Sequence, residues 1–191
     1  MRRIIGLLMS LLFVVGVVGL MYGADNDSIT LKVTCAPALN VEITETEYDF
    51  GSLANNFATV STYAITVTNN SGGRTEDYRI DSSTYTTPGN WQIVEADPVD
   101  EQFALQAMLN TTQPEHVDFV AGDYLDTTAG GNGQDMDSTD FAGDEDGDDV
   151  SGSGGSNTRS LWFRLQTPDS AADTNEQSFT VTITAWDAGT F

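Results

Sequence analysis

Cysteine and histidine each occur once in this chain, as Cys35 and His116, and each scarcity excludes a class of site. A single cysteine cannot form a disulfide within the chain, so Cys35 is either a buried small apolar residue or a thiol able to pair between chains. One cysteine and one histidine also give no ligand spacing for zinc or haem. The sequence therefore predicts no cofactor of these kinds.

Catalytic signatures are equally scarce. His116 follows Gln113-Pro114-Glu115 in a segment typical of a solvated loop, and no glycine pattern of a nucleophile elbow frames a serine. The 29 acidic residues contain no pair of carboxylates that stands out as a general acid and base. We expect no catalytic residues and a protein that is not an enzyme. An enzyme that uses His116 remains the third hypothesis.

Basic residues are few and unevenly placed. The chain has 29 acidic and 7 basic residues, with a formal net charge of −22, and no Lys or Arg lies between Arg79 and Arg159. Such a charge repels phosphates of nucleic acids and anionic lipid surfaces, and it attracts cations. The composition excludes nucleic acid as an expected partner.

The first 24 residues form the one long apolar stretch. Met1-Arg2-Arg3 precedes an apolar run from Ile4 to Met21, and Gly23-Ala24 precedes the first acidic residue, Asp25. This layout predicts a secretory signal peptide over 1–24, with retention as an N-terminal membrane anchor as the alternative. In either case residues 25–191 face an extracytoplasmic compartment, so we expect a secreted or cell-surface protein that contacts a membrane only through an uncleaved N-terminal segment.

The rest of the chain alternates apolar and polar residues with a period of two. Because residues i and i+2 share one face of a strand, each run predicts a strand with one buried face. The run 103–109 alternates in the same way, which favours a strand over a helix. Turn residues separate the runs. We predict an all-β fold: one antiparallel β-sandwich domain of 7–9 strands over 25–191. The alternating runs lie at 29–33, 39–43, 63–68, 78–80, 91–93, 161–165 and 179–185.

Residues 126–159 interrupt this pattern with an acidic stretch rich in Gly, Asp and Ser. We expect a long surface loop there, either mobile or ordered by a ligand. Clustered carboxylates on a flexible loop suit calcium, although the stretch matches no EF-hand, since position six from Asp144 is Asp149 and position twelve is Gly155. A solvated acidic loop is the alternative. The candidate calcium ligands are Asp144, Asp146, Asp148, Asp149, Asp135 and Asp137, with Asp140 beside them.

Three tryptophans offer a further alternative, a platform on which a sugar stacks. Trp91 and Trp162 lie within apolar runs and are expected in the core. Trp186 follows the last alternating run and is the best exposed candidate.

Several short segments carry a family resemblance. Tyr48-Asp49-Phe50-Gly51-Ser52-Leu53, followed by Ile65 through Gly72, resembles the bacterial immunoglobulin-like domains of the abnormal-spindle and choice-of-anchor type. Leu161–Leu165 and Phe179–Thr184 are similar to the closing hairpin of such surface modules. The resemblance covers about 35 residues. It implies an immunoglobulin-like β-sandwich that supports, spaces or assembles, and it implies no ligand.

These observations favour a structural protein, a self-associating subunit of an extracellular filament, sheath or surface layer. The expected partner is the chain itself, through strand addition, or another surface protein. Segment Asp25–Thr34, freed by removal of the signal, is a candidate donated strand. The alternative is a calcium-dependent, adhesin-like binding module that uses the acidic loop.

Overall fold

The computed structural model describes residues 38–89, 91–125 and 133–189. By its internal contacts the chain divides into two units, Met1–Cys35 and Ala36–Phe191, and every described residue belongs to the second. The predicted signal helix over 1–24, Cys35 and the candidate strand Asp25–Thr34 lie outside the described residues. Within the described ranges, no helix has the length and apolar character needed to cross a membrane.

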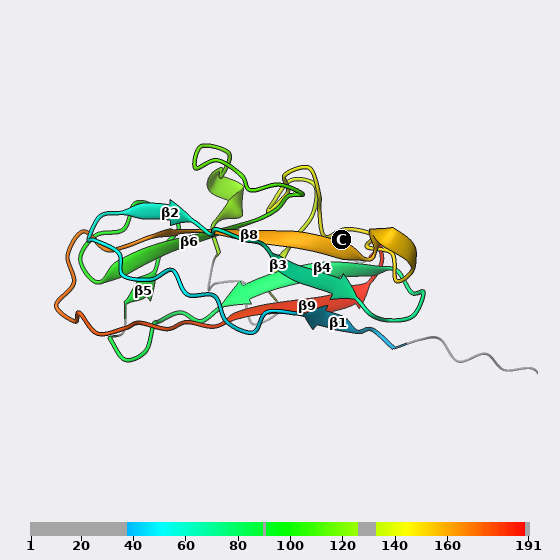
Figure 1. Cartoon of the computed structure of the whole chain (residues 1–191), viewed down its shortest axis with the longest axis horizontal. Helices are drawn as coiled ribbons and strands as arrows, with labels where there is room; N and C mark the ends of the chain where they lie inside the picture. Colours follow the sequence, from blue (N-terminus) through cyan, green and yellow to red (C-terminus); the bar gives the residue numbers. More distant parts are fainter. Residues whose placement is uncertain (1–37, 90, 126–132, 190–191) are drawn as a thin grey trace, which may run out of the picture. The chain divides into compact units, whose positions relative to one another are not determined.

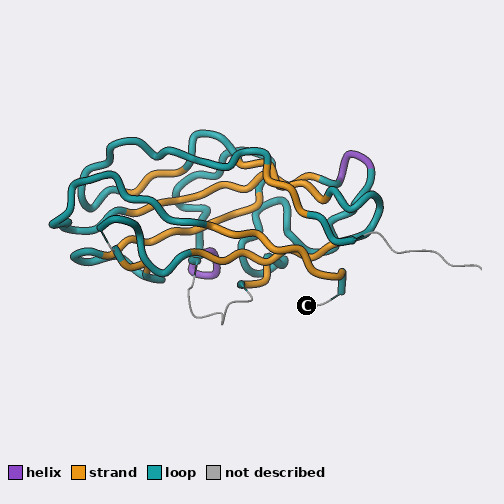
Figure 2. The backbone as a smooth tube through the Cα atoms, turned by 90° about the horizontal axis from the view of Figure 1, so that it is seen from below, coloured by secondary structure: helices purple, strands orange, loops and turns teal. Residues whose placement is uncertain are grey.

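The regular secondary structure of the described residues is almost entirely β-strand, arranged in two sheets (Figure 1). One sheet has the strand order β1-β3-β8-β6-β5, with β2 also paired to β8, and the other has the order β7-β4-β9. Short 3-10 helices at Ala121–Asp123 (η1) and Gly154–Ser156 (η2) are the two purple segments of Figure 2. The predicted all-β architecture with two sheets is confirmed. The strands are β1 Val41–Ile43, β2 Ala58–Val60, β3 Ile65–Asn69, β4 Glu76–Ser82, β5 Gln92–Ile93, β6 Gln102–Leu109, β7 Gln134–Asp135, β8 Thr158–Gln166 and β9 Val181–Asp187.

Strand β8 is the centre of the larger sheet. It pairs with β6 along Leu161–Gln166, while β3 and β2 share its other edge, β3 beside residues 158–161 and β2 beside residues 164–166. Ser61 bridges the break between them: its amide donates to the Phe163 carbonyl at 2.7 Å, and its Oγ accepts from the Phe163 amide at 3.1 Å. Strands β2 and β3 therefore act as two halves of one interrupted strand.

One pairing differs from the predicted antiparallel arrangement. Strand β5 runs parallel to β6, with Gln92 opposite Gln102 and Ile93 opposite Phe103. The connection over 94–101 is shorter than the dozen or so residues that a parallel crossover usually needs, and it suffices here because β5 is only two residues long. Antiparallel pairing holds for the other strand pairs of the two sheets.

Strand β6 is buried on both faces. Phe103, Leu105, Ala107 and Leu109 point into the main core between the sheets. On the other face Met108 packs in a second cluster with Phe119 and Trp162, which covers the outside of the sheet. This double coverage explains why 103–109 has apolar residues at nearly every position, and the predicted strand there is confirmed.

The segment expected as one acidic loop over 126–159 overlaps β7, η2 and the start of β8. Residues 126–132 lie outside the described residues. In the described part, Met136, Phe141 and Val150 are buried in the main core, and Glu76 exchanges two backbone hydrogen bonds with Val150. The segment from 133 onward is thus held by apolar anchors at intervals, which a count of acidic residues does not indicate.

The turn between β3 and β4 is organised by Asn69, whose side chain is buried. Its Nδ2 donates to the carbonyls of Arg74 and Val150, both at 2.8 Å, and its Oδ1 accepts from the amide and hydroxyl of Ser71. A single amide thereby ties the turn to the 133–157 segment. The glycine at 73 has φ of +122°, a conformation that strongly favours glycine.

Candidate functional site

An open cleft lies between two long connections, residues 44–57 from β1 to β2 and residues 167–180 from β8 to β9. Its volume is about 810 Å³. The floor consists of core side chains that retain a little exposure, among them Phe163 and Leu165 at 8 % and Ile183 at 7 %. The hydrophobic core is therefore accessible from one side of this unit.

The cleft remains open because neither connection completes a sheet. Residues 45–55 form no backbone–backbone hydrogen bond with any other described residue. Aromatic contacts hold this connection instead: the Tyr48 ring lies 4.7 Å from that of Phe50 and 4.8 Å from that of Tyr63. The Thr62 amide also donates to the Tyr48 hydroxyl at 2.7 Å. The resemblance motif at 48–53 thus forms one wall of the cleft.

The rim of the cleft is acidic. None of the described residues that line it is Lys, Arg or His. The combination of an apolar floor and a negative rim suits an occupant with one apolar face and positive charge on the other. The acidic lining residues are Glu45, Glu47, Asp49, Asp173 and Glu176.

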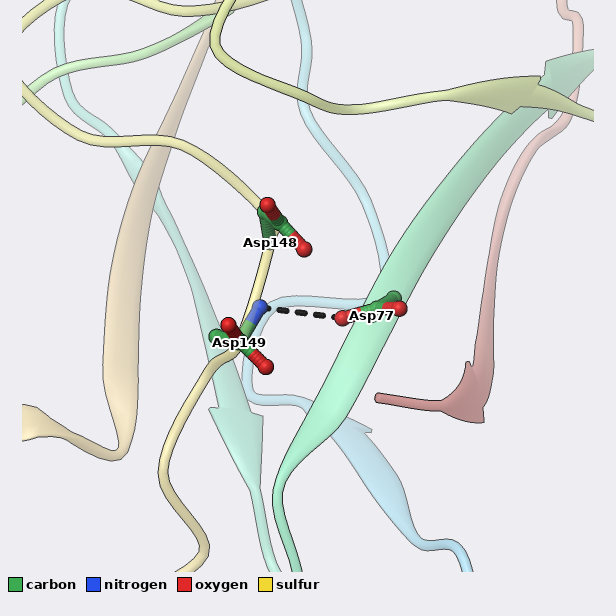
Figure 3. A group of neighbouring side chains, drawn as sticks. All are labelled: Asp77, Asp148 and Asp149. Carbon is green, nitrogen blue, oxygen red and sulfur yellow. Dashed lines mark hydrogen bonds between the residues drawn. The ribbon is translucent and has the colours of Figure 1, made fainter. Parts of the chain in front are cut away.

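A second candidate site is a group of three carboxylates, Asp77, Asp148 and Asp149. One ligand oxygen from each lies within 4.8 Å of the others. Asp77 is on β4 and is fully buried, whereas Asp148 and Asp149 are on the segment that runs beside it (Figure 3). The Asp149 amide donates to Asp77 Oδ1 at 2.9 Å, which fixes the two segments together.

The electrostatics of this group favour a cation. Desolvation raises the pKa of Asp148 first, and its hydrogen bond to Asp77 and the charges of Asp77, Asp149 and Asp146 raise it further. A divalent cation would remove the repulsion among these carboxylates, and carboxylate oxygens are the ligands that calcium and magnesium prefer. Among the described residues, Asp77, Asp148 and Asp149 could thus hold a metal ion.

The other predicted ligands have different partners. Asp144 accepts hydrogen bonds from the amide and hydroxyl of Thr111, which lower its pKa. Asp135 pairs with Arg79 at 2.5 Å between Oδ1 and Nε, and Asp137 Oδ1 accepts from the amides of Thr139 and Asp140.

Asp146 lies beside an arginine. Together with Asp144 it lines a polar hollow of about 370 Å³, and its carbonyl accepts from Arg159 Nε at 2.6 Å. Of the six predicted ligands, the structure therefore brings together Asp148 and Asp149.

His116 lies on an exposed loop next to Arg164. The shortest contact joins Arg164 Nη2 to the His116 Nε2 atom at 2.8 Å. Desolvation and the guanidinium charge lower the pKa of His116. Its hydrogen bonds within the described residues go to Arg164 and to no serine or threonine hydroxyl.

The tryptophans are mostly covered. Trp162 is buried and its Nε1 donates to the Asn110 carbonyl at 2.7 Å, while Trp91 packs against the main core. The Arg79 guanidinium lies 4.5 Å from the centre of the Trp186 ring, so an arginine already covers one face of the candidate sugar platform.

Comparison with known proteins adds no family. No family model, curated protein or solved structure matches this chain. The geometry of the cleft and of the three carboxylates therefore carries the functional argument.

Sequence reasoning missed two of these features. Asp77 lies in a strand far from the acidic stretch, and it comes beside Asp149 through the pairing of Glu76 with Val150 and the hydrogen bond from the Tyr78 amide to the Gly147 carbonyl. One feature of the sequence could have indicated the cleft: residues 171–178 do not alternate between apolar and polar side chains.

Proposed function

We propose that this chain is a non-catalytic structural protein of the cell surface or extracellular space, a subunit that associates with further copies of itself in a filament, sheath or surface layer. The cleft is the observation that carries this proposal. A core accessible through about 810 Å³ leaves apolar area exposed that an association would bury.

Three features support the same function. The backbone of residues 45–55, which has no backbone–backbone partner among the described residues, suits strand addition, which uses main-chain hydrogen bonds for affinity. The apolar run Ile4–Met21 after two arginines supports export. Finally, the two sheets and the Asn69 turn are compatible with an immunoglobulin-like sandwich, which we propose as the finer description of the fold.

The test is the mass of the full chain in solution as a function of concentration. Light scattering on size-exclusion fractions, with electron microscopy of the largest fraction, should show ordered species well above the 20.5 kDa of one chain. The measurement is repeated with calcium and with chelator. A single 20.5 kDa species at every concentration in both buffers would contradict the proposal.

A second candidate function is calcium-dependent binding, an adhesin-like role. The grouping of Asp77, Asp148 and Asp149 favours it, because a cation there would join β4 to the segment 145–150. This function does not exclude the first, since a cation could stabilise each subunit of an assembly.

A further inference from the structure

We propose that the guanidinium of Arg164 is a binding site for a carboxylate group, and that His116 is the displaceable residue that occupies this site in the free chain. The carboxylate belongs either to a small organic acid or to an acidic side chain of another copy. The site uses none of the residues that line the cleft and none of the three grouped aspartates. It therefore does not rest on the proposed self-association.

Arg164 is held near the middle of the larger sheet. On β8 it lies opposite Val60 of β2 on one side and opposite Gln106 of β6 on the other. Trp162, two residues earlier on the same face, belongs to the cluster that covers the outside of this sheet. Arg164 retains 9 % of its exposure. Its positive charge is thus largely removed from water.

The hydrogen-bond partners of this guanidinium are neutral in the described part of the chain. Nη1 donates to Gln106 Oε1, and Nη2 donates to Gln166 Oε1 at 3.2 Å. The other contacts are with the ring of His116, whose pKa is lowered by desolvation and by the guanidinium itself. No salt bridge between described residues includes Arg164, in a chain with 29 acidic residues. Because a buried charge is normally paired, an anion from outside is the missing partner.

The edge of the guanidinium formed by Nε and Nη2 is incompletely satisfied. Nε lies 3.1 Å from Nδ1 and 3.2 Å from Nε2 of His116, and Nη2 lies 2.8 Å from the same Nε2 atom. A neutral imidazole has a single acceptor nitrogen, whereas this edge carries two parallel N–H groups. A carboxylate has two oxygens and accepts both bonds in the fork geometry. The edge therefore suits a carboxylate better than the histidine that covers it.

His116 is placed so that it can leave. Residues 115–118 are all exposed, and the loop is held on either side by the buried residues Pro114 and Phe119. Exposed side chains change rotamer within nanoseconds, so the ring can turn away while these two anchors stay in place. A rotation of one side chain thus opens the Arg164 edge to solvent.

The charge of the whole chain selects among anions. The formal net charge of −22 repels every anion, and it repels a dianion such as sulfate or phosphate about twice as strongly as a singly charged carboxylate. A carboxylate is also planar, like the guanidinium that it would meet. We therefore expect a monocarboxylate as the ligand.

His116 is a site-specific reporter because it is the one histidine of the chain. Proton NMR of its ring in the full chain is followed while sodium acetate replaces sodium chloride at constant pH and ionic strength. The His116 resonances should shift along a saturating curve. In Arg164→Lys, which keeps the charge and loses the fork, half-saturation should require at least about tenfold more acetate. Arg74→Lys, whose arginine pairs with Asp187, is the matched control and should follow wild type.

Two NMR results would overturn the inference. One is a His116 spectrum that does not change when acetate replaces chloride. The other is the same half-saturation in Arg164→Lys as in wild type, which would place the acetate elsewhere.

His116→Ala is the variant with the opposite expected sign. Removal of the ring leaves the Nε and Nη2 edge of Arg164 open, so acetate should raise Tm more in this variant than in wild type, relative to chloride. If acetate raises Tm less in His116→Ala than in wild type, the histidine is a ligand or a structural contact and the displacement is wrong.

Light scattering distinguishes the two sources of the carboxylate. If wild type self-associates and both acetate and Arg164→Lys reduce the mass of its assemblies, the occupant is an acidic side chain of another copy. If the mass is unchanged while the His116 resonances still respond, the site serves a free organic acid. Both results support the site. A wild-type chain that stays a monomer contradicts the proposed function and leaves this site standing.

Discussion

At the scale of single residues, a few buried polar side chains hold the fold where strand pairing stops. Asn69 uses all its side-chain hydrogen-bonding capacity in the β3–β4 turn, and Asp123 Oδ1 accepts from the Phe141 amide at 3.1 Å. Burial raises the pKa of Asp123. These side chains connect turns to the segment 133–157, so each replaces backbone hydrogen bonds that a continuous pair of strands would have made.

Glu76 provides a test by pH. It is fully buried, its Oε1 accepts from the Asn40 amide at 2.6 Å, and desolvation raises its pKa above the ordinary value of 4.5. The folded state therefore holds this proton more tightly than the unfolded state, and stability is lost as pH rises through the raised pKa. Glu76→Gln keeps the acceptor oxygen and removes the charge.

Relative to wild type, Glu76→Gln should gain stability progressively as pH rises above 4.5, measured by urea unfolding at a series of pH values. Glu115→Gln, an exposed carboxyl, is the matched control and should follow wild type. A Glu76→Gln curve parallel to wild type from pH 4 to 8 (about the usual stable range) would show that burial of this carboxyl does not govern the pH dependence.

At the scale of elements, interruption of strands is the recurring feature. Strands β2 and β3 share one edge of β8, and Ser61 satisfies the backbone of Phe163 between them. Strand β6 likewise pairs in pieces, with β5 near its start and with bridges to Tyr124 and Ala142 further along. Side chains and short bridges thus satisfy backbone groups along β6 and β8 that no single neighbouring strand covers in full.

Ser61→Ala tests this interruption. The Ser61 side chain is fully buried, so its loss leaves the Phe163 amide without its acceptor, at a cost of about 1–3 kcal/mol in the free energy of unfolding. Chemical denaturation measures the change. Ser138→Ala, at an exposed position, is the control, and equal stability of the two variants would contradict the role given to Ser61.

The sequence predicted those strands that bury one face, because their apolar and polar residues alternate. The alternating runs at 63–68, 103–109, 161–165 and 179–185 all correspond to strands. Strand β7 was missed because Gln134-Asp135 has no apolar residue, and β2 because Ala58-Thr59-Val60 is too short to show a period. Their pairing comes from neighbouring strands, which no local pattern encodes.

At the scale of the whole molecule, the site depends on long-range register. Asp148 and Asp149 could be selected from their local density of acids, but Asp77 joins them only through the pairing of β4 with the segment around Val150. Asp144 lies in an equally acidic part of the sequence, yet its carboxylate accepts a hydrogen bond from the Thr111 amide and lies outside the group. Composition identifies candidates for a cation, and the tertiary fold decides which of them meet.

Calcium titration followed by thermal unfolding tests the group. At a concentration a hundredfold above Kd, binding to the folded state should raise Tm by about 5–10 °C. Asp148→Asn should abolish the rise, whereas Asp144→Asn and the exposed control Asp169→Asn should retain it. A rise that persists in Asp148→Asn, or that disappears in Asp169→Asn, would place the effect elsewhere.

The acidic rim has a consequence for the free chain before the self-association that we propose. Two clefts with accessible apolar floors would adhere to each other without specificity, but each floor is surrounded by carboxylates, and like charges keep the two clefts apart. The rim thus acts as a gatekeeper against amorphous aggregation. Its reach shrinks to about 3 Å in molar salt, so the same surface that protects the subunit in dilute medium would cease to do so in brine.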